Sequence, residues 1–179
     1  MTLDSAGASG APLPTLPSGT RVAALVSSYH GELCRKMLGS ARRTLEACGL
    51  ASGNLRVLEV PGAYELPVVA RRLAGRKDVD AVLCFGLVLR GSTDHDRYIS
   101  NAVATRLVDA SFETNTPVLF GVLTPNTVEQ AEERARLAEE GGLDKGREVA
   151  LAAVHVLNAL ESAELDFNDL PTHAPGEDQ

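Results

Sequence analysis

The sequence of 179 residues predicts an α/β fold: a three-layer α/β/α sandwich with a four-stranded parallel sheet. Short apolar runs rich in β-branched residues alternate with longer segments whose apolar residues recur at helical spacing. The apolar runs are nearly continuous, which is typical of strands buried on both faces. The segments between them are long enough for the helical crossovers that parallel strands require.

The first half of the chain contains two strand–helix units. Residues 21–27 (RVAALVS) form the first apolar run and residues 55–60 (LRVLEV) the second. Between them, residues 31–49 carry apolar side chains at helical spacing and end at a glycine, a common helix stop. After the second strand, PGAY leads into a helix predicted over residues 65–75. Pro67 is tolerated there because the N–H groups of a helix's first turn have no partners within the helix.

The second half repeats the pattern. Residues 79–89 (VDAVLCFGLVL) form the third strand and residues 117–123 (PVLFGVL) the fourth. The stretch over residues 124–140 begins with a Thr/Asn cap and is predicted to continue as a polar helix, and residues 147–163 form a last amphipathic helix. The helix that follows His95 carries one apolar face, made of Ile99, Ala102, Val103, Leu107 and Ala110.

Length, charge and cysteine content restrict the class of protein. The formal net charge of −7 argues against a nucleic-acid-binding protein, whose binding surface is usually basic. No apolar stretch approaches the roughly 20 residues of a membrane helix, and no secretory signal is visible, so we expect a cytoplasmic protein. Cys34, Cys48 and Cys84 have no paired spacing, which predicts buried free thiols rather than a zinc site or disulfides.

Composition divides the chain into three parts. Residues 1–19 are rich in Ala, Gly, Pro and Ser without periodicity and are predicted to be a flexible N-terminal segment. Residues 20–163 hold all the predicted strands and helices and are expected to form one domain. Residues 164–179 are polar and interrupted by prolines, which predicts a flexible C-terminal tail.

Polar residues follow the third strand at the edge where such sheets bind ligands, beyond the carboxyl ends of the strands. Gly91, Ser92 and Thr93 stand just before a predicted helix, whose free N–H groups suit an anion, although an ordinary helix start has the same pattern. His95, in the first turn, is either a general acid or base or a surface residue. The histidines show no spacing typical of a metal site.

The few aromatic residues gather at the same edge. Aromatic residues make up 4% of the chain, yet Tyr29, Tyr64 and Phe120 all stand at strand ends, as core residues or as platforms for a ring. Glu65 begins a helix, where an acidic residue is favoured by the helix dipole in any case. Arg134 would by default be a solvated residue of a polar helix. The residues alone therefore predict an anion-binding, proton-transferring pocket and leave the substrate open.

Three motifs in order resemble the lumazine synthases of riboflavin biosynthesis. They are VPGAYELP (60–67), GLVLRGSTDH (86–95), and PVLFGVLT (117–124) with EQAEERA (129–135). The likeness covers roughly residues 20 to 163. It implies the flavodoxin-like strand order 2-1-3-4 and a transferase that needs no metal or redox cofactor.

The resemblance also implies the reaction. 5-Amino-6-(D-ribitylamino)uracil condenses with 3,4-dihydroxy-2-butanone 4-phosphate to give 6,7-dimethyl-8-ribityllumazine, phosphate and water, the penultimate step of riboflavin biosynthesis. His95 would shuttle protons, and Arg134 would hold the phosphate. The other implied roles are ring and ribityl binding, main-chain contacts to the uracil edge, and phosphate binding. The residues implied in them are Tyr29, Ala63, Tyr64, Glu65, Leu87, Val88, Leu89, Ser92, Thr93, Phe120 and Lys145.

The resemblance implies a homo-pentamer with active sites between subunits, Phe120 reaching the pocket of its neighbour. The loop after Arg134 is stretched to ARLAEEGGLDKG, and such insertions go with free or at most paired pentamers rather than closed shells. Several positions depart from the usual family residues without removing a motif residue that holds substrate or moves protons. They are Ser28, Asp96, Arg97, Ala102 and Thr105.

Two other functions fit parts of the sequence. One is a catalytically weak pentameric flavin- or lumazine-binding protein, although ligand storage alone would not need His95, Arg134 or the turn at Gly91. The other is a phosphate-responsive signalling domain of flavodoxin-like fold. That domain would need acidic residues at the end of the first strand, where Ser28 and Tyr29 stand instead.

Overall fold

The sheet has the predicted topology. The structure is a computed structural model that describes residues 12–166, 169 and 171. Within these residues, four parallel strands lie in the order β2-β1-β3-β4: β1 (Val22–Ser27), β2 (Leu55–Val60), β3 (Ala81–Leu87) and β4 (Val118–Leu123). Each strand lies within the range of its apolar run. The fold class and strand order are confirmed.

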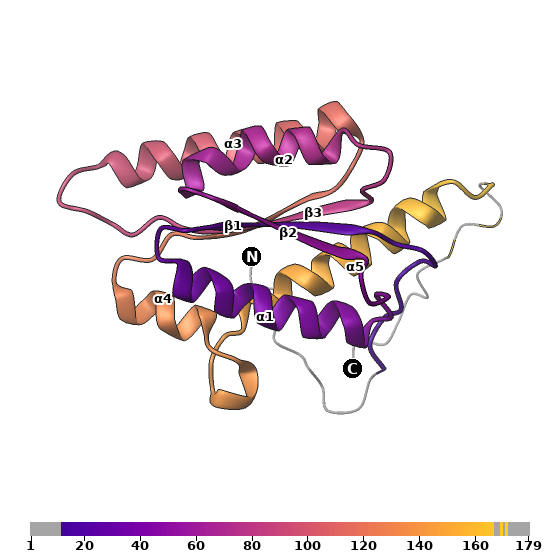
Figure 1. Ribbon diagram of the computed structural model, residues 1–179, viewed down its shortest axis with the longest axis horizontal. Coiled ribbons are helices and arrows are strands. Elements are labelled where there is room, and N and C mark those ends of the chain that lie inside the picture. Colours follow the sequence, from indigo (N-terminus) through magenta and orange to yellow (C-terminus); the bar gives the residue numbers. More distant parts are fainter. Residues whose placement is uncertain (1–11, 167–168, 170, 172–179) are drawn as a thin grey trace.

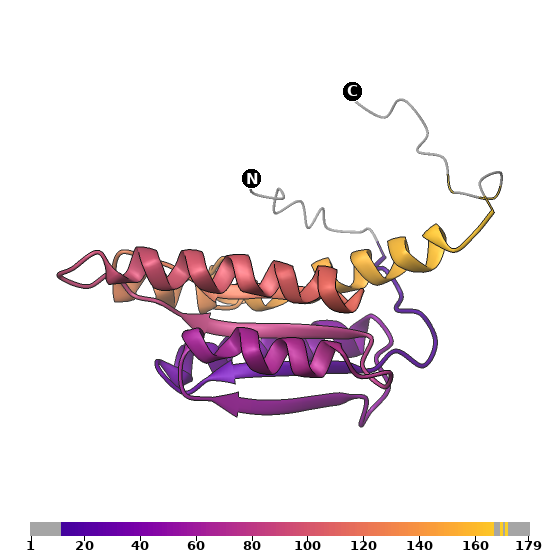
Figure 2. The ribbon, with the colours of Figure 1, turned by 90° about the horizontal axis from the view of Figure 1, so that it is seen from above.

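The helices cover both faces of the sheet (Figures 1 and 2). On one face lie α2 (Leu66–Ala74) and α3 (His95–Thr114). On the other lie α1 (Gly31–Ala47), α4 (Val128–Ala135) and α5 (Lys145–Ala163). The sheet is therefore the middle of three layers. A 3-10 turn, η1 (Ala63–Glu65), precedes α2, so the helix predicted from residue 65 begins in this tighter form.

The central strands separate two apolar cores. In β1, Ala24 and Val26 pack on the side of α1 and α5, whereas Ala23 and Leu25 pack on the side of α2 and α3. Successive strand residues point to opposite faces, so a strand covered on both sides needs apolar residues at every position. Phe85 of β3 is the largest of the fully buried side chains.

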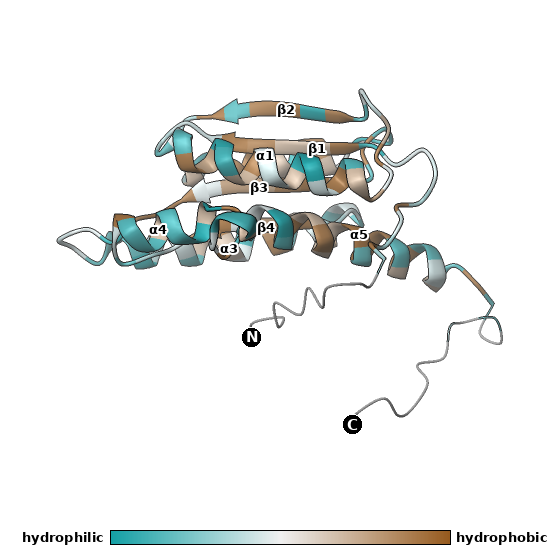
Figure 3. Ribbon diagram, turned by 90° about the horizontal axis from the view of Figure 1, so that it is seen from below, coloured by the Kyte–Doolittle hydropathy of each residue, from teal (hydrophilic) through white to brown (hydrophobic). Residues whose placement is uncertain are grey.

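Strand β2 departs from the prediction that all strands are buried on both faces. It is an edge strand with exposed residues through its centre, and Figure 3 shows it in alternating hydrophobic and hydrophilic colours. Val57 and Leu58 are 37% and 41% exposed, and Glu59 lies 3.5 Å from Arg35 of α1. Val57 and Leu58 are consecutive and point to opposite faces, so the position of β2 at the sheet edge leaves both of its faces incompletely covered.

Helix α4 is shorter than predicted. Its start is confirmed, because the Thr127 side chain accepts a hydrogen bond from the Gln130 N–H at 3.3 Å. The helix ends at Ala135 instead of continuing to residue 140, and Arg136 is extended. A 3-10 turn, η2 (Ala138–Glu140), follows, and Gly141 at φ 77° turns the chain back. A polar helical pattern does not show where a helix ends, because the carbonyls of its last turn bond instead to N–H groups of the following loop, such as that of Leu143, which donates to Glu133.

The described part of the N-terminal segment packs on its own chain. Leu16 is buried in the core beside α1 and α5, and its N–H donates to the carbonyl of Cys48 at 2.8 Å. Asn158 of α5 donates to the carbonyl of Thr15 at 3.1 Å. For residues 12–19 this differs from the flexible segment that composition predicts, because a single buried leucine is enough to dock a short segment. Residues 1–11 and most of the predicted C-terminal tail lie outside the described residues.

The three thiols are predicted to be unreactive in the folded protein. All are buried and free, as the sequence predicts. Burial raises the pKa of Cys34 to about 11 and also raises the pKa of Cys84 and Cys48. Because the thiolate is the reactive form, iodoacetamide at pH 8 should modify Cys34 and Cys84 of the native protein at least about 100-fold more slowly than the same residues of the urea-unfolded protein. Mass spectrometry of timed samples measures this, and equal rates in both states would contradict it.

No helix among the described residues has the length and apolar character needed to cross a bilayer.

Candidate active site

The loops beyond β1 and β2 bring an aromatic ring and a carboxylate together. The Ser28 N–H donates to the carbonyl of Val60 at 2.8 Å, and the Tyr29 N–H donates to that of Pro61 at 3.0 Å, so the two chain segments remain paired past the sheet. A Cβ on Gly62 would lie 2.9 Å from Glu65 Oε2 and 3.1 Å from Tyr29 Cδ2. Both side chains therefore lie over the glycine, which leaves room for them.

This part of the site is open to solvent. Tyr29 and Tyr64 are 70% and 64% exposed, whereas Glu65 is partly buried and Ala63 is buried. Large aromatic side chains are usually buried, so Tyr29, which stands in solvent beside the Glu65 carboxylate, and the exposed Tyr64 leave apolar surface open to a ligand. An aromatic platform with an acceptor beside it suits a flat ring that carries hydroxyl groups.

The end of β3 supplies main-chain groups, but one of the donors is already used. Leu87 and Val88 are buried and Leu89 is partly buried. The Val88 N–H donates to the carbonyl of Leu123 at 2.8 Å, which extends the β3–β4 pairing beyond the strand. A ligand at this edge must therefore use other main-chain groups of this segment.

The start of α3 holds His95 in a defined orientation. Thr93 Oγ1 lies 2.7 Å from His95 Nδ1, and a Cβ on Gly91 would lie 2.8 Å from His95 Cε1. The imidazole therefore lies over Gly91 with one nitrogen engaged. When Nδ1–H donates to the hydroxyl, Nε2 has a lone pair for a proton, and when the hydroxyl donates, Nε2 carries the proton. Ser92, Thr93 and His95 are all exposed.

Arg134 and Lys145 lie on helices of the opposite face. Arg134, in the last turn of α4, donates from Nη1 to the carbonyl of Gln130 at 3.0 Å. Lys145, the first residue of α5, has its Nζ 2.5 Å from Oε2 of Glu148. Both cationic side chains are partly buried, so each is held along its own helix.

One chain does not enclose all the predicted residues. His95 begins α3 on one face of the sheet, whereas Arg134 and Lys145 belong to the α4–α5 layer on the other (Figure 1). Phe120 lies on the edge strand β4 and is 44% exposed, on the strand face of Val118 and Val122. The predicted site residues are thus divided between the two faces of the sheet.

Two hollows contain none of the predicted site residues. One, of about 420 Å³, runs along the first turns of α3 and is lined by Asp94, Arg97, Tyr98 and Asn101. The sequence analysis did not predict this hollow. Its one indication in the sequence is Arg97, which departs from the residue usual at that position in the family that the motifs resemble. Its position beside His95 extends the exposed polar surface at this end of α3.

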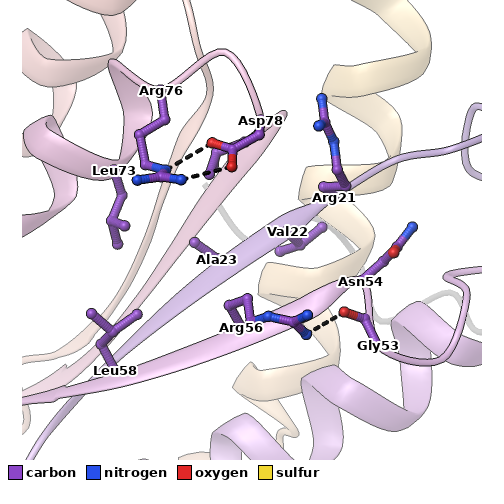
Figure 4. A pocket seen from close by; sticks show the side chains of 11 residues that line it. Arg21, Val22, Ala23, Gly53, Asn54, Arg56, Leu58, Leu73, Arg76 and Asp78 are labelled. Carbon is purple, nitrogen blue, oxygen red and sulfur yellow. Dashed lines mark hydrogen bonds and ion pairs between the residues drawn. The ribbon is translucent and has the colours of Figure 1, made fainter.

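The other hollow, of about 440 Å³, lies at the amino ends of β1 and β2, beside the end of α2 and the loop that follows it (Figure 4). Its arginines already have partners within the chain. Arg76 binds both oxygens of Asp78, which lowers the pKa of that carboxyl, and Arg56 donates to the carbonyl of Gly53. These pairings make it a poor anion site.

Comparison with known proteins gives one consistent family. A family model described as 6,7-dimethyl-8-ribityllumazine synthase matches residues 19–161, a range that contains every predicted site residue. A protein called 6,7-dimethyl-8-ribityllumazine synthase from Desulfotalea psychrophila is 39% identical over 144 residues, covering 80% of this chain and 91% of that protein. One of the same name from Syntrophus aciditrophicus is 37% identical over 154 residues, covering 83% and 98%.

Proposed function

Because the chain belongs to the 6,7-dimethyl-8-ribityllumazine synthase family, we propose that it is a transferase that makes this lumazine in riboflavin biosynthesis. The substrates are 5-amino-6-(D-ribitylamino)uracil and 3,4-dihydroxy-2-butanone 4-phosphate, and phosphate and water leave. The observation that carries the proposal is the Thr93–His95 pair, held over Gly91 at the carboxyl edge of the sheet.

His95 moves the protons of the condensation. The amino group of the pyrimidine attacks the ketone carbon, a C–N bond forms, and the carbonyl oxygen leaves as water after it has been protonated. The imidazole takes a proton from nitrogen or carbon and returns one to oxygen, and Thr93 keeps the ring oriented while it does so. A positioned acid–base group contributes about 10²–10⁴-fold to such steps.

Arg134 and the open turn before α3 bind the phosphate. When the C–O bond to phosphate breaks, the electron pair leaves with the phosphate, and the negative charge that develops must be stabilised. A guanidinium binds phosphate oxygens through two parallel N–H groups. The N–H groups at the start of α3, near Ser92 and Thr93, add further donors, and Lys145 draws the phosphate in.

The aromatic platform orients the pyrimidine. Its ring stacks on Tyr29 beside Tyr64, and Glu65 accepts hydrogen bonds from the ribityl hydroxyls. Leu87, Val88 and Leu89 contribute main-chain contacts to the uracil edge. Holding the two reactants in contact supplies much of the remaining acceleration, because well-oriented reactants have large effective molarities.

The division of the predicted residues between two faces of the sheet supports assembly with further copies of the chain. His95 belongs to α3 and Arg134 to α4, which cover opposite faces of the sheet, and Phe120 and Leu58 are exposed on its two edge strands. We expect a homo-pentamer of five times the 18.9 kDa chain mass, in which Phe120, Arg134 and Lys145 complete the neighbour's site. Sedimentation velocity at micromolar concentration measures the mass. A monomer or a closed shell of virus-like size would contradict it.

The decisive experiment mixes the protein with both substrates and follows the fluorescence of the lumazine product, with substrates alone as the background. Product formation well above this background is expected, together with one phosphate released for each lumazine. Tight binding of the pyrimidine without product formation would instead favour the pentameric flavin- or lumazine-binding protein.

A further inference from the structure

We propose that Asp144 is a positioning residue for this reaction, tying the Arg134 end of α4 and the Lys145 start of α5 to α1. The inference rests on the proposed function, since it concerns the two cations assigned to phosphate binding. Asp144 lies outside the three motifs that carry the resemblance, within the stretched loop that follows α4.

The carboxylate of Asp144 joins three segments of the chain. Its side chain is buried, with the residue 7% exposed. Oδ1 accepts from the Ser40 hydroxyl of α1 at 2.5 Å and from the Arg147 N–H of α5 at 3.1 Å. Oδ2 accepts a longer bond, 3.4 Å, from the Ala138 N–H of η2. Buried charge is costly unless it is hydrogen-bonded, and here each oxygen has a partner.

The backbone of the same residue closes the loop. Asp144 adopts the left-handed conformation (φ 45°, ψ 57°), which Asn and Asp tolerate better than most residues. Its N–H donates to the carbonyl of Arg136 at 3.0 Å, and the Leu143 N–H donates to that of Glu133 at 3.0 Å. These two bonds bracket Arg134 in sequence, so the position of the end of α4 depends on the loop.

The start of α5 is pressed against α1. A Cβ on Gly146 would lie 2.2 Å from the carbonyl oxygen of Met37, one helical turn before Ser40. Lys145 thus stands between a residue bonded to α1 and a residue in direct backbone contact with it. Its main chain cannot shift unless the Asp144–Ser40 bond or this contact gives way.

Loss of the carboxylate should therefore affect the phosphate-binding part of the reaction selectively. Asp144 touches neither reactant, and it acts through the placement of Arg134 and Lys145. The pyrimidine platform stands on other elements, the loops after β1 and β2. A shift of about 1 Å in a positioning group is enough to cost a reaction about 100-fold.

The test compares Asp144→Ala with Asp144→Asn in the assembled protein. For Asp144→Ala we expect KM for the butanone phosphate and the inhibition constant of inorganic phosphate to rise by about 10-fold or more. KM for the pyrimidine should change by less than about 2-fold. Asp144→Asn keeps the left-handed backbone and one acceptor oxygen for Ser40 and Arg147, so it should restore most of the phosphate affinity.

Matched variants separate positioning from general destabilisation. Ser40→Ala should shift the same two constants in the same direction by a smaller factor, and Glu139→Ala, an exposed acid of the same loop, should shift neither. Circular dichroism checks the folding of each variant. If Asp144→Ala does not fold, Ser40→Ala and Asp144→Asn carry the test through calorimetric titration with inorganic phosphate.

The two proposals can fail independently. A wild-type protein that forms no lumazine overturns the proposed function, and phosphate titration of the same variants still tests the role of Asp144. An active wild-type protein whose phosphate constants are unchanged in Ser40→Ala and Asp144→Ala overturns the inference alone. Equal rises in the constants for phosphate and pyrimidine would also overturn it, since they would indicate a general loss of structure.

Discussion

Replacement of His95 by alanine is expected to lower kcat by about 10²–10³-fold while the protein stays folded and assembled. The imidazole is exposed at the start of α3 and contributes no buried packing, so its removal should leave the free energy of unfolding nearly unchanged. The catalytic loss is large because imine formation and phosphate elimination both need a group that takes and returns protons near neutral pH. Stopped-flow measurement of lumazine formation, with both substrates saturating, gives kcat directly.

Two further variants make the His95 result specific. His95→Gln keeps a hydrogen-bonding group near Thr93 but cannot carry the proton, so its kcat should fall nearly as far as that of the alanine variant. Thr93→Val removes only the partner of Nδ1 and should cost about 10-fold or less, because the ring still rests on Gly91. A His95→Ala enzyme with more than half the wild-type kcat would show that another group moves the protons.

Replacement of Gly146 by alanine should destabilise the protein by about 3 kcal/mol. Helix propensity alone predicts the opposite sign, since alanine is favoured over glycine inside a helix by about 1 kcal/mol. Here the new methyl group would lie 2.2 Å from the carbonyl oxygen of Met37, and that neighbour is backbone that cannot rotate away. The first turn of α5 would have to move off α1, opening the contact that also holds Asp144.

Gly39, on α1, is a matched control because it is also helical. A Cβ there would come no nearer than 4.0 Å to Arg43 Nη1, the tip of a flexible side chain. Gly39→Ala should therefore stabilise the protein by about 0.5–1 kcal/mol. Urea unfolding followed by circular dichroism, at one fixed protein concentration, compares both variants with the wild type. Equal stability of Gly146→Ala and wild type would contradict the close approach of α5 to α1.

Much of the fold could be predicted because it follows from local patterns. Strands β1 and β3 are buried at every position, and their residues are apolar except for Ser27 at the end of β1, as burial by helices on both faces requires. Pro67 in the first turn of α2 and the cap at Thr127 mark helix starts through their own backbone chemistry. The residues that follow the strands could be assigned to one edge because all the strands are parallel.

The misses share a physical cause, which is that the deciding partner lies far away in sequence. Strand β2 has the composition of a covered strand, yet its place at the sheet edge leaves Val57 and Leu58 exposed. Helix α4 ends early and its loop turns back to α1, where Ser40 bonds to Asp144 across 104 residues of sequence. No local pattern reports such a bond.

Periodicity and motifs thus predicted the order of strands and helices and the chemistry at the carboxyl ends of the strands, because each depends on residues a few positions apart. The division of the candidate site over two faces of the sheet, with His95 on one and Arg134 and Lys145 on the other, emerged only when the chain was folded. Periodicity sets which side of an element is apolar. Which face of the sheet that element covers depends on the packing of the whole chain.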